Sequence, residues 1–142
     1  MISLAIALFA VSAPLETAGS PAGSPQAPAP ASAAESAPTQ AARQWLALVD
    51  AGKWQESWAG TTQSFQSLNT VGSWESASQT ARVPLGRVLS RTMTSAEYIP
   101  APPRGLQLVR FKTDFANKAG ATETLSLARE GGSWRVAGYF IE

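Results

Sequence analysis

The sequence predicts an α+β domain in which three to four helices come first and a four-stranded antiparallel sheet follows. Up to Gly86, apolar residues recur three to four positions apart, which is the period of a helix. After Gly86 they recur at every second position, which is the period of a strand. Turn-forming residues then divide the second half into about four strands. Helices that precede the strands, instead of alternating with them, are typical of the α+β class.

The first helix is expected to begin with Thr39 as its N-cap, directly after Pro38, and to stop at Gly52. Its apolar face is formed by Ala41, Trp45, Leu48 and Val49. A second short helix, with Trp54 and Trp58 four positions apart, ends near Gly60, and a further helical stretch starts at Thr62 with Phe65 and Leu68 on one side.

The last helix is expected to be capped by Ser73 and to end before Pro84, because the residue that precedes a proline disfavours the helical conformation. Trp74, Ala77 and Ala81 are predicted to point inward from it.

The four strands are predicted at residues 88–99, 106–115, 121–129 and 134–141. Gly131-Gly132 predicts a two-residue type I′ hairpin between the last two strands, with positive φ at both glycines. This turn pairs Leu127 with Val136, and it pairs Glu123 with Phe140. Glu123 then lies on the apolar face with Phe111, and Tyr139 lies on the open face.

The composition excludes several classes of function. The 142 residues contain no Cys and no His, and their formal net charge is +1. A chain without Cys and His lacks the nucleophile and base of most triads and the commonest transition-metal ligands, so no metal site is expected. No phosphate-binding or cofactor motif is present, so no cofactor is expected. A net charge near zero gives no support to nucleic-acid binding.

The N-terminal third is expected to be a signal peptide and a linker. Residues 1–13 are apolar and end in Val11-Ser12-Ala13, a small-residue pattern typical of signal-peptidase sites, although no basic residue precedes them. This run is too short to span a membrane. Twenty of the twenty-five residues 14–38 are Pro, Gly, Ala or Ser, a composition that predicts a disordered linker. The domain is then expected at 39–142, in a periplasmic or secreted protein.

Three groups of residues carry a resemblance to a known family. They are Trp45 to Gly52 with Ser57-Trp58; Arg82 to Gly86 with Arg91; and Phe115 to Lys118 with Glu123 and Gly132 to Ile141. In this order and spacing they resemble the bacterial domain of unknown function 4019, although Trp54 stands where that family has Tyr. The resemblance implies an exported domain with a curved sheet of the cystatin-like or nuclear-transport-factor-2-like kind. It implies no activity and no catalytic residue.

Glu123 is the main candidate for a functional residue, because a carboxylate on a buried face either takes part in chemistry or is paired with a positive charge. One interpretation makes it the acid/base of a small enzyme of the ketosteroid-isomerase-like type, in a cone between helices and sheet. The other interpretation pairs it with Arg91, Arg82 or Lys118, or places it at a solvated strand end. Asp50 is expected to find a backbone donor or a basic partner.

Six residues are candidates for lining a ligand pocket: Glu123, Arg91, Trp45, Trp58, Phe111 and Phe140. For the tryptophans, packing in the core is the competing interpretation. Three functions stay open: a non-catalytic module that binds a small ligand or an envelope protein, the small enzyme, and a homodimer that uses the open sheet face.

Overall fold

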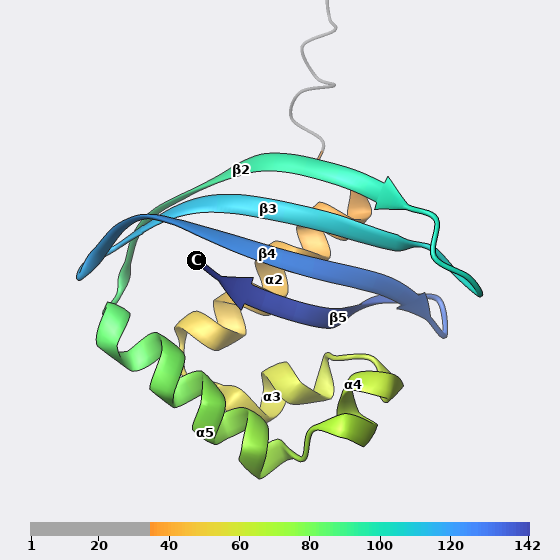
Figure 1. The fold of residues 1–142 in the computed structure, drawn as a ribbon, viewed down its shortest axis with the longest axis horizontal. Coiled ribbons are helices and arrows are strands. Elements are labelled where there is room, and N and C mark those ends of the chain that lie inside the picture. The colour runs from red at the N-terminus through yellow and green to blue at the C-terminus, as the bar shows by residue number, and fades with distance from the viewer. Residues whose placement is uncertain (1–34) are drawn as a thin grey trace, which may run out of the picture. The chain divides into compact units, whose positions relative to one another are not determined.

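The computed structural model describes residues 35–142, so the predicted signal peptide and nearly all of the predicted linker lie outside the described residues. Ser36–Glu142 forms one compact unit. Four α-helices of this unit are followed by an antiparallel sheet that arches over them (Figure 1), which confirms the predicted α+β class. In the described residues no helix is long and apolar enough to cross a membrane.

The sheet contains β2 (Val88–Ile99), β3 (Leu106–Phe115), β4 (Lys118–Glu130) and β5 (Ser133–Ile141) in the order of the chain. The predicted bounds of β2 and β3 are confirmed. β4 starts three residues earlier than predicted, because the turn that precedes it is centred on Ala116 and Asn117 and not on 117–120. Gly131 and Gly132 have φ values of 58° and 84°, which confirms the predicted positive-φ hairpin.

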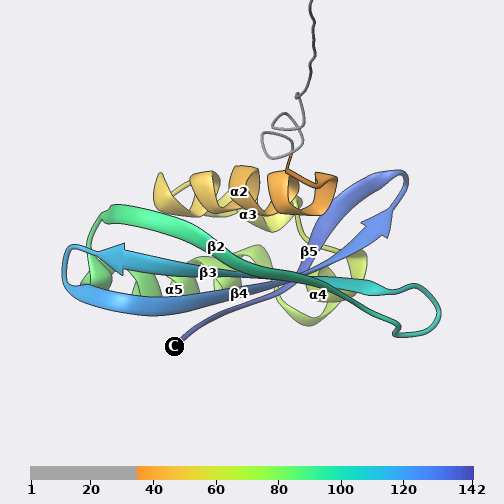
Figure 2. The same ribbon diagram turned by 90° about the horizontal axis from the view of Figure 1, so that it is seen from above.

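The helices are α2 (Ala37–Asp50), α3 (Trp54–Ala59), α4 (Gln63–Leu68) and α5 (Val71–Arg82), and a 3-10 turn, η3 (Val83–Leu85), follows. Seen from above, α2 runs along the sheet (Figure 2). Gly52 ends α2 as predicted: its φ is 73°, and the N–H of Lys53 donates to the carbonyl oxygen of Leu48 across it.

Two predicted helix starts are wrong. Ser36, and not Thr39, is the N-cap of α2, and Thr39 lies buried inside the first turn with its hydroxyl 3.0 Å from that of Ser36. Pro38 belongs to this first turn, where its missing N–H costs nothing. Thr70, and not Ser73, caps α5: its hydroxyl accepts the N–H of Ser73 at 3.1 Å.

The predicted inward face of α5 is confirmed for Trp74 and wrong for its other two residues. Ala77 and Ala81 are exposed, whereas Trp74, Ser78 and Arg82 point inward at a spacing of four. The prediction followed apolar character alone. The bulky Trp74 sets the face, and Arg82 lies two turns later on the same face, where it pairs with Asp50.

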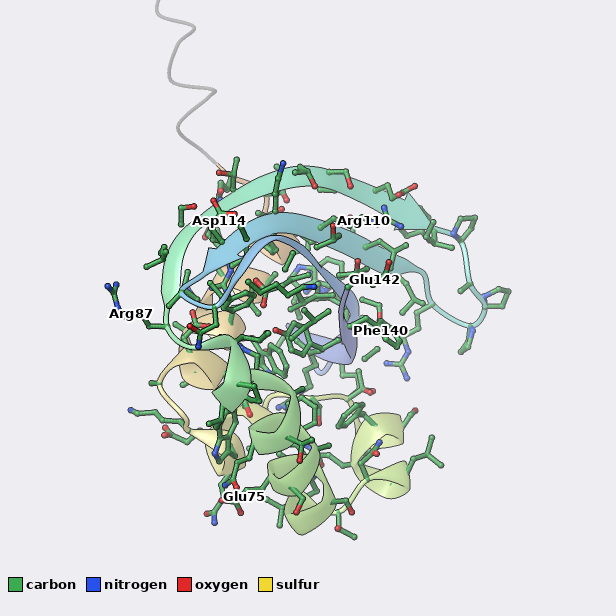
Figure 3. The ribbon with its side chains drawn as sticks, turned by 60° about the vertical axis from the view of Figure 1, so that its left-hand side comes forward. Glu75, Arg87, Arg110, Asp114, Phe140 and Glu142 are labelled. Atoms are coloured by element: carbon green, nitrogen blue, oxygen red, sulfur yellow. The ribbon has the colours of Figure 1, made fainter. Side chains whose placement is uncertain are left out.

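The core lies between α2 and the concave face of the sheet. Ala42, Trp45, Leu46 and Val49 of α2 pack against Val109, Phe111, Leu125, Leu127 and Val136. The predicted face of α2 is therefore rotated toward Ala42 and Leu46, and Leu48 is only partly buried. Side chains fill the space between the sheet and the helices, whereas Arg87 projects into solvent (Figure 3).

The predicted pairing of β4 with β5 holds only near the hairpin. Leu127 pairs with Val136 as expected, but a bulge after Ser126 shifts the rest by one residue, so that Leu125 pairs with Tyr139 and Glu123 with Ile141. A shift by one residue exchanges the two faces of a strand. Tyr139 therefore points into the concave side, and Phe140 is 63% exposed on the other side.

Candidate functional site

A line of polar side chains crosses the concave face, and each of the four strands contributes one member. Arg91 of β2 pairs with Thr113 of β3, Glu123 lies on β4, and Tyr139 lies on β5. All four lie on the core side of the sheet, beneath the C-terminal ends of α2 and α5. Together with Asp50 and Arg82 they form what we call the buried charge network.

Glu123 is at the centre of this network and has no exposed surface. Its Oε1 atom accepts hydrogen bonds from Arg91 Nε at 2.7 Å and Thr113 Oγ1 at 2.6 Å, and its Oε2 atom accepts the hydroxyl of Tyr139. All three partners donate, which is the environment that an ionised carboxylate requires. Of the three predicted basic partners, Arg91 forms the ion pair.

Asp50 connects the sheet to both long helices. Arg91 donates to its two carboxylate oxygens at 2.7 and 3.1 Å, and Arg82 Nη2 donates to Oδ1 at 2.6 Å. The expected basic partner of Asp50 is thus confirmed, twice over. Arg82 also donates to the Tyr139 hydroxyl at 3.4 Å and stacks on Phe115, with its Cζ atom 4.9 Å from the ring centre.

The network is electrically neutral, because it joins two carboxylates and two guanidinium groups. Arg82 is 6% exposed and Arg91 is 11% exposed, while Asp50 is the member that solvent reaches best. A buried charge is costly unless it is paired and hydrogen-bonded. The pairing explains how Glu123, Arg82 and Arg91 can lie inside so small a domain, with Asp50 at its edge.

Burial and pairing act in opposite directions on these groups. Burial by itself would raise the pKa of Asp50, but the hydrogen bonds from Arg91 and Arg82 outweigh it and hold that pKa below its ordinary value. Burial likewise opposes the charge of Arg91, yet Asp50 and Glu123 raise its pKa above the ordinary value. The pKa of Tyr139 is raised strongly, first by burial and then by the neighbouring charge of Glu123.

Sequence reasoning missed Thr113 and Tyr139, and it named Arg82 only as a partner for Glu123. The spacing of four from Trp74 through Ser78 to Arg82 was a usable signal, since it places all three on one helix face. The signal for Tyr139 was Gly138, because an isolated glycine inside a strand indicates a bulge, and Gly138 pairs with Ser126 at the bulge that turns Tyr139 inward.

The other predicted pocket residues separate into core and surface. Trp45 and Phe111 are buried in the core, and Trp45 Nε1 donates to the Ser57 carbonyl at 2.7 Å. Trp58 is partly buried and donates to the Asn69 carbonyl at 2.7 Å, which ties α3 to the end of α4. Phe140 does not join Glu123, because it lies on the opposite face of the sheet.

A surface hollow of about 390 Å³ lies between α4 and the loop that joins β2 to β3. We call it the α4 groove. Its lining is mostly apolar and includes Phe65, Leu68, Pro102, Pro103, Leu106, Ala128 and Ala137. In residues 35–142, no three acidic side chains gather as a metal site.

Residues 41–139 match a family described as proteins of unknown function, DUF4019. The chain belongs to the DUF4019 family. The match spans all six members of the buried charge network, from Asp50 to Tyr139. No curated protein and no solved structure matches the chain. What DUF4019 domains do therefore has to be argued from the side chains of this domain.

Proposed function

We propose that this DUF4019 domain is a non-catalytic binding or accessory module of the bacterial cell envelope, periplasmic or secreted. The state of Glu123 is the observation that carries the proposal. A catalytic acid or base must touch its substrate. Glu123 has no exposed surface, and its carboxylate already accepts three hydrogen bonds. These contacts support a role for the network in joining helices to sheet.

Carbodiimide labelling with glycinamide tests this proposal, because the reaction needs an accessible carboxylate. Glu123 should stay unlabelled in the native full-length protein, whereas Glu97, whose side chain is 50% exposed, should be labelled. Both residues should react in urea. Native labelling of Glu123 at a rate close to that of Glu97 would show an open cone and overturn the non-catalytic proposal.

The envelope location rests on the N-terminal sequence. The apolar residues 1–13 with Val11-Ser12-Ala13 support export, and the Pro- and Ala-rich residues 14–38 support a spacer between an export signal and the domain. Mass spectrometry of the protein from its native host should find a mature chain that starts after Ala13 or slightly later. Intact Met1 in the cytosolic fraction would end this part of the proposal.

The enzyme of the ketosteroid-isomerase-like type remains a second candidate, favoured by one observation. Tyr139 and Glu123 form a hydroxyl–carboxylate pair under the sheet, a combination that can pass a proton. Such an enzyme would have to part Glu123 from Arg91 to admit a substrate. The labelling experiment above separates the two candidates.

A homodimer is the third candidate, favoured by the exposed ring of Phe140 beside Gly138 on the convex side of the sheet. Removing this ring should matter only in an interface. Light scattering at micromolar concentration of the parent and of Phe140→Ser should show a dimer that the substitution dissociates. A monomer in both cases would refute it.

A further inference from the structure

The α4 groove exposes apolar side chains that are not part of the hydrophobic core. None of the residues of α4 is buried, and Leu68 at its C-terminal end is 84% exposed. Thr62 and Thr70 fix the position of this helix through the caps of α4 and α5, so that Phe65 and Leu68 are held in place on one wall. An apolar hollow with a large exposed apolar side chain at its edge is typical of a ligand site.

Of the two charged residues that line the groove, Arg104 and Glu130, the positive one is the more exposed, at 53% against 21%. Arg104 donates one hydrogen bond to the carbonyl of Arg129 at 2.8 Å. Glu130 is the acid nearest to Arg104, and the two are only loosely paired, at 4.0 Å. The other oxygen of Glu130 accepts the N–H of Gln63 at 3.1 Å. Arg135 lies beyond Glu130, since both line the adjoining hollow.

The exposed guanidinium group of Arg104 thus lies beside an apolar hollow. We propose that the α4 groove binds a single-chain amphiphile with an apolar tail and an anionic head, of the fatty carboxylate class. The tail lies between Leu68 and the wall formed by Pro102 and Pro103, and the head pairs with Arg104. This inference rests on the proposed binding function and names its ligand class.

The chemistry of the groove also sets what it should reject. A cationic head would face Arg104, and a head without a tail would leave the apolar lining in water. A volume of about 390 Å³ is near the lower end of the roughly 300–1,000 Å³ that small-molecule pockets span, which favours a short chain over a diacyl lipid.

Isothermal titration calorimetry of the full chain with decanoate, below the concentration at which it forms micelles, tests the proposal. We expect saturable binding of one decanoate per chain. Decyltrimethylammonium, with the same tail and the opposite charge, should bind about tenfold more weakly or not at all, and acetate should give no measurable heat. No saturable binding of decanoate, or equal binding of the two ten-carbon ligands, would overturn it.

Substitutions at the groove locate the binding and have matched controls elsewhere. Leu68→Ser should weaken decanoate binding about fivefold or more, since it removes apolar contact with the tail. Leu89→Ser changes an exposed leucine of β2 that is not part of the groove, and it should leave the affinity unchanged. Arg104→Gln should weaken decanoate binding. Arg87→Gln should not, because Arg87 is exposed and does not line the groove.

The outcomes distinguish the ligand class from the proposed function. If decanoate does not bind while Glu123 stays protected from carbodiimide, the ligand class is wrong and the non-catalytic module stands. If decanoate binds equally well to Leu68→Ser and to Leu89→Ser, the α4 groove is not the site. If Glu123 is labelled in the free protein and decanoate protects it, the ligand enters the cone, and both proposals fail.

Discussion

Replacing Glu123 by Gln should destabilise the domain strongly, although the two side chains have nearly the same shape. The substitution removes one negative charge and leaves Asp50 to balance both Arg82 and Arg91. It also turns one end of the side chain into a donor, whereas Arg91, Thr113 and Tyr139 all donate toward Glu123. The Tyr139 hydroxyl can rotate to accept, but the bond that it donated is then lost.

The magnitude follows from this arrangement. Leaving a buried charge without its partner costs about 3–5 kcal/mol. Arg91 keeps its two hydrogen bonds to Asp50, so we expect a smaller loss of about 2–4 kcal/mol in the free energy of unfolding. In a domain of this size, such a loss corresponds to a fall of the melting temperature by about 10–20 °C.

Urea unfolding followed by tryptophan fluorescence measures this loss. Glu97→Gln is the matched control, because Glu97 pairs with Arg110 at 2.6 Å on the exposed side of the sheet, where an ion pair contributes about 0–1 kcal/mol. A Glu123→Gln protein as stable as the parent, or more stable, would refute the network as a structural element. It would move weight to Glu123 as a functional acid that is held at a cost to stability.

Three further predictions concern the hairpin and the pH dependence. Gly131→Val should lower the free energy of unfolding in urea by about 1–2 kcal/mol or more, because φ is 58° there; no neighbour would clash, so the loss reports the backbone conformation alone. Gly72→Ala, in the first turn of α5, should leave the free energy of unfolding unchanged. Because the pKa of Asp50 is lowered, its contribution is complete above about pH 4 and lost as the pH falls through its folded pKa, so Asp50→Asn should show a flatter loss of stability in acid. Because the pKa of Tyr139 is raised, folding favours its protonated form; stability should fall as the pH rises above about 10, and less so in Tyr139→Phe.

The sequence predicts the strands of this domain better than its helices. Gly86 precedes β2, and the prolines and Gly105 of the loop separate β2 from β3. These residues have strong local conformational preferences, so the ends of the two strands can be predicted from them. Hydroxyl residues that can cap a helix stand at several positions near each start, and only the packed structure selects Ser36 over Thr39 and Thr70 over Ser73.

The candidate site was predictable only in part, because the pairing register of β4 with β5 shifts by one residue along the strands. Alternation along β4 places Glu123 on the buried face, and the list of its basic partners contains Arg91, which the ion pair bears out. The bulge places Ala137 of β5 as the extra residue, directly before Gly138, and that glycine was the one local signal for it. The bulge reverses the sheet faces on which Tyr139 and Phe140 were predicted to lie. The Tyr139 hydroxyl therefore reaches Glu123, and the Phe140 ring is exposed to solvent.

The buried charge network also constrains the order of events during synthesis. The contacts of Glu123 with Thr113 and Tyr139 form between neighbouring strands. The contacts of the two arginines join residues that are 32, 41 and 57 positions apart, so these cannot form within a single helix or hairpin. The ribosome releases Asp50 and Arg82 well before Glu123 and Tyr139. A nascent chain that carries all four helices but lacks the last two strands would hold Arg82 without its full set of partners. We therefore expect the helices to stay loosely packed until β4 and β5 arrive, so that the domain becomes resistant to proteases in one late step.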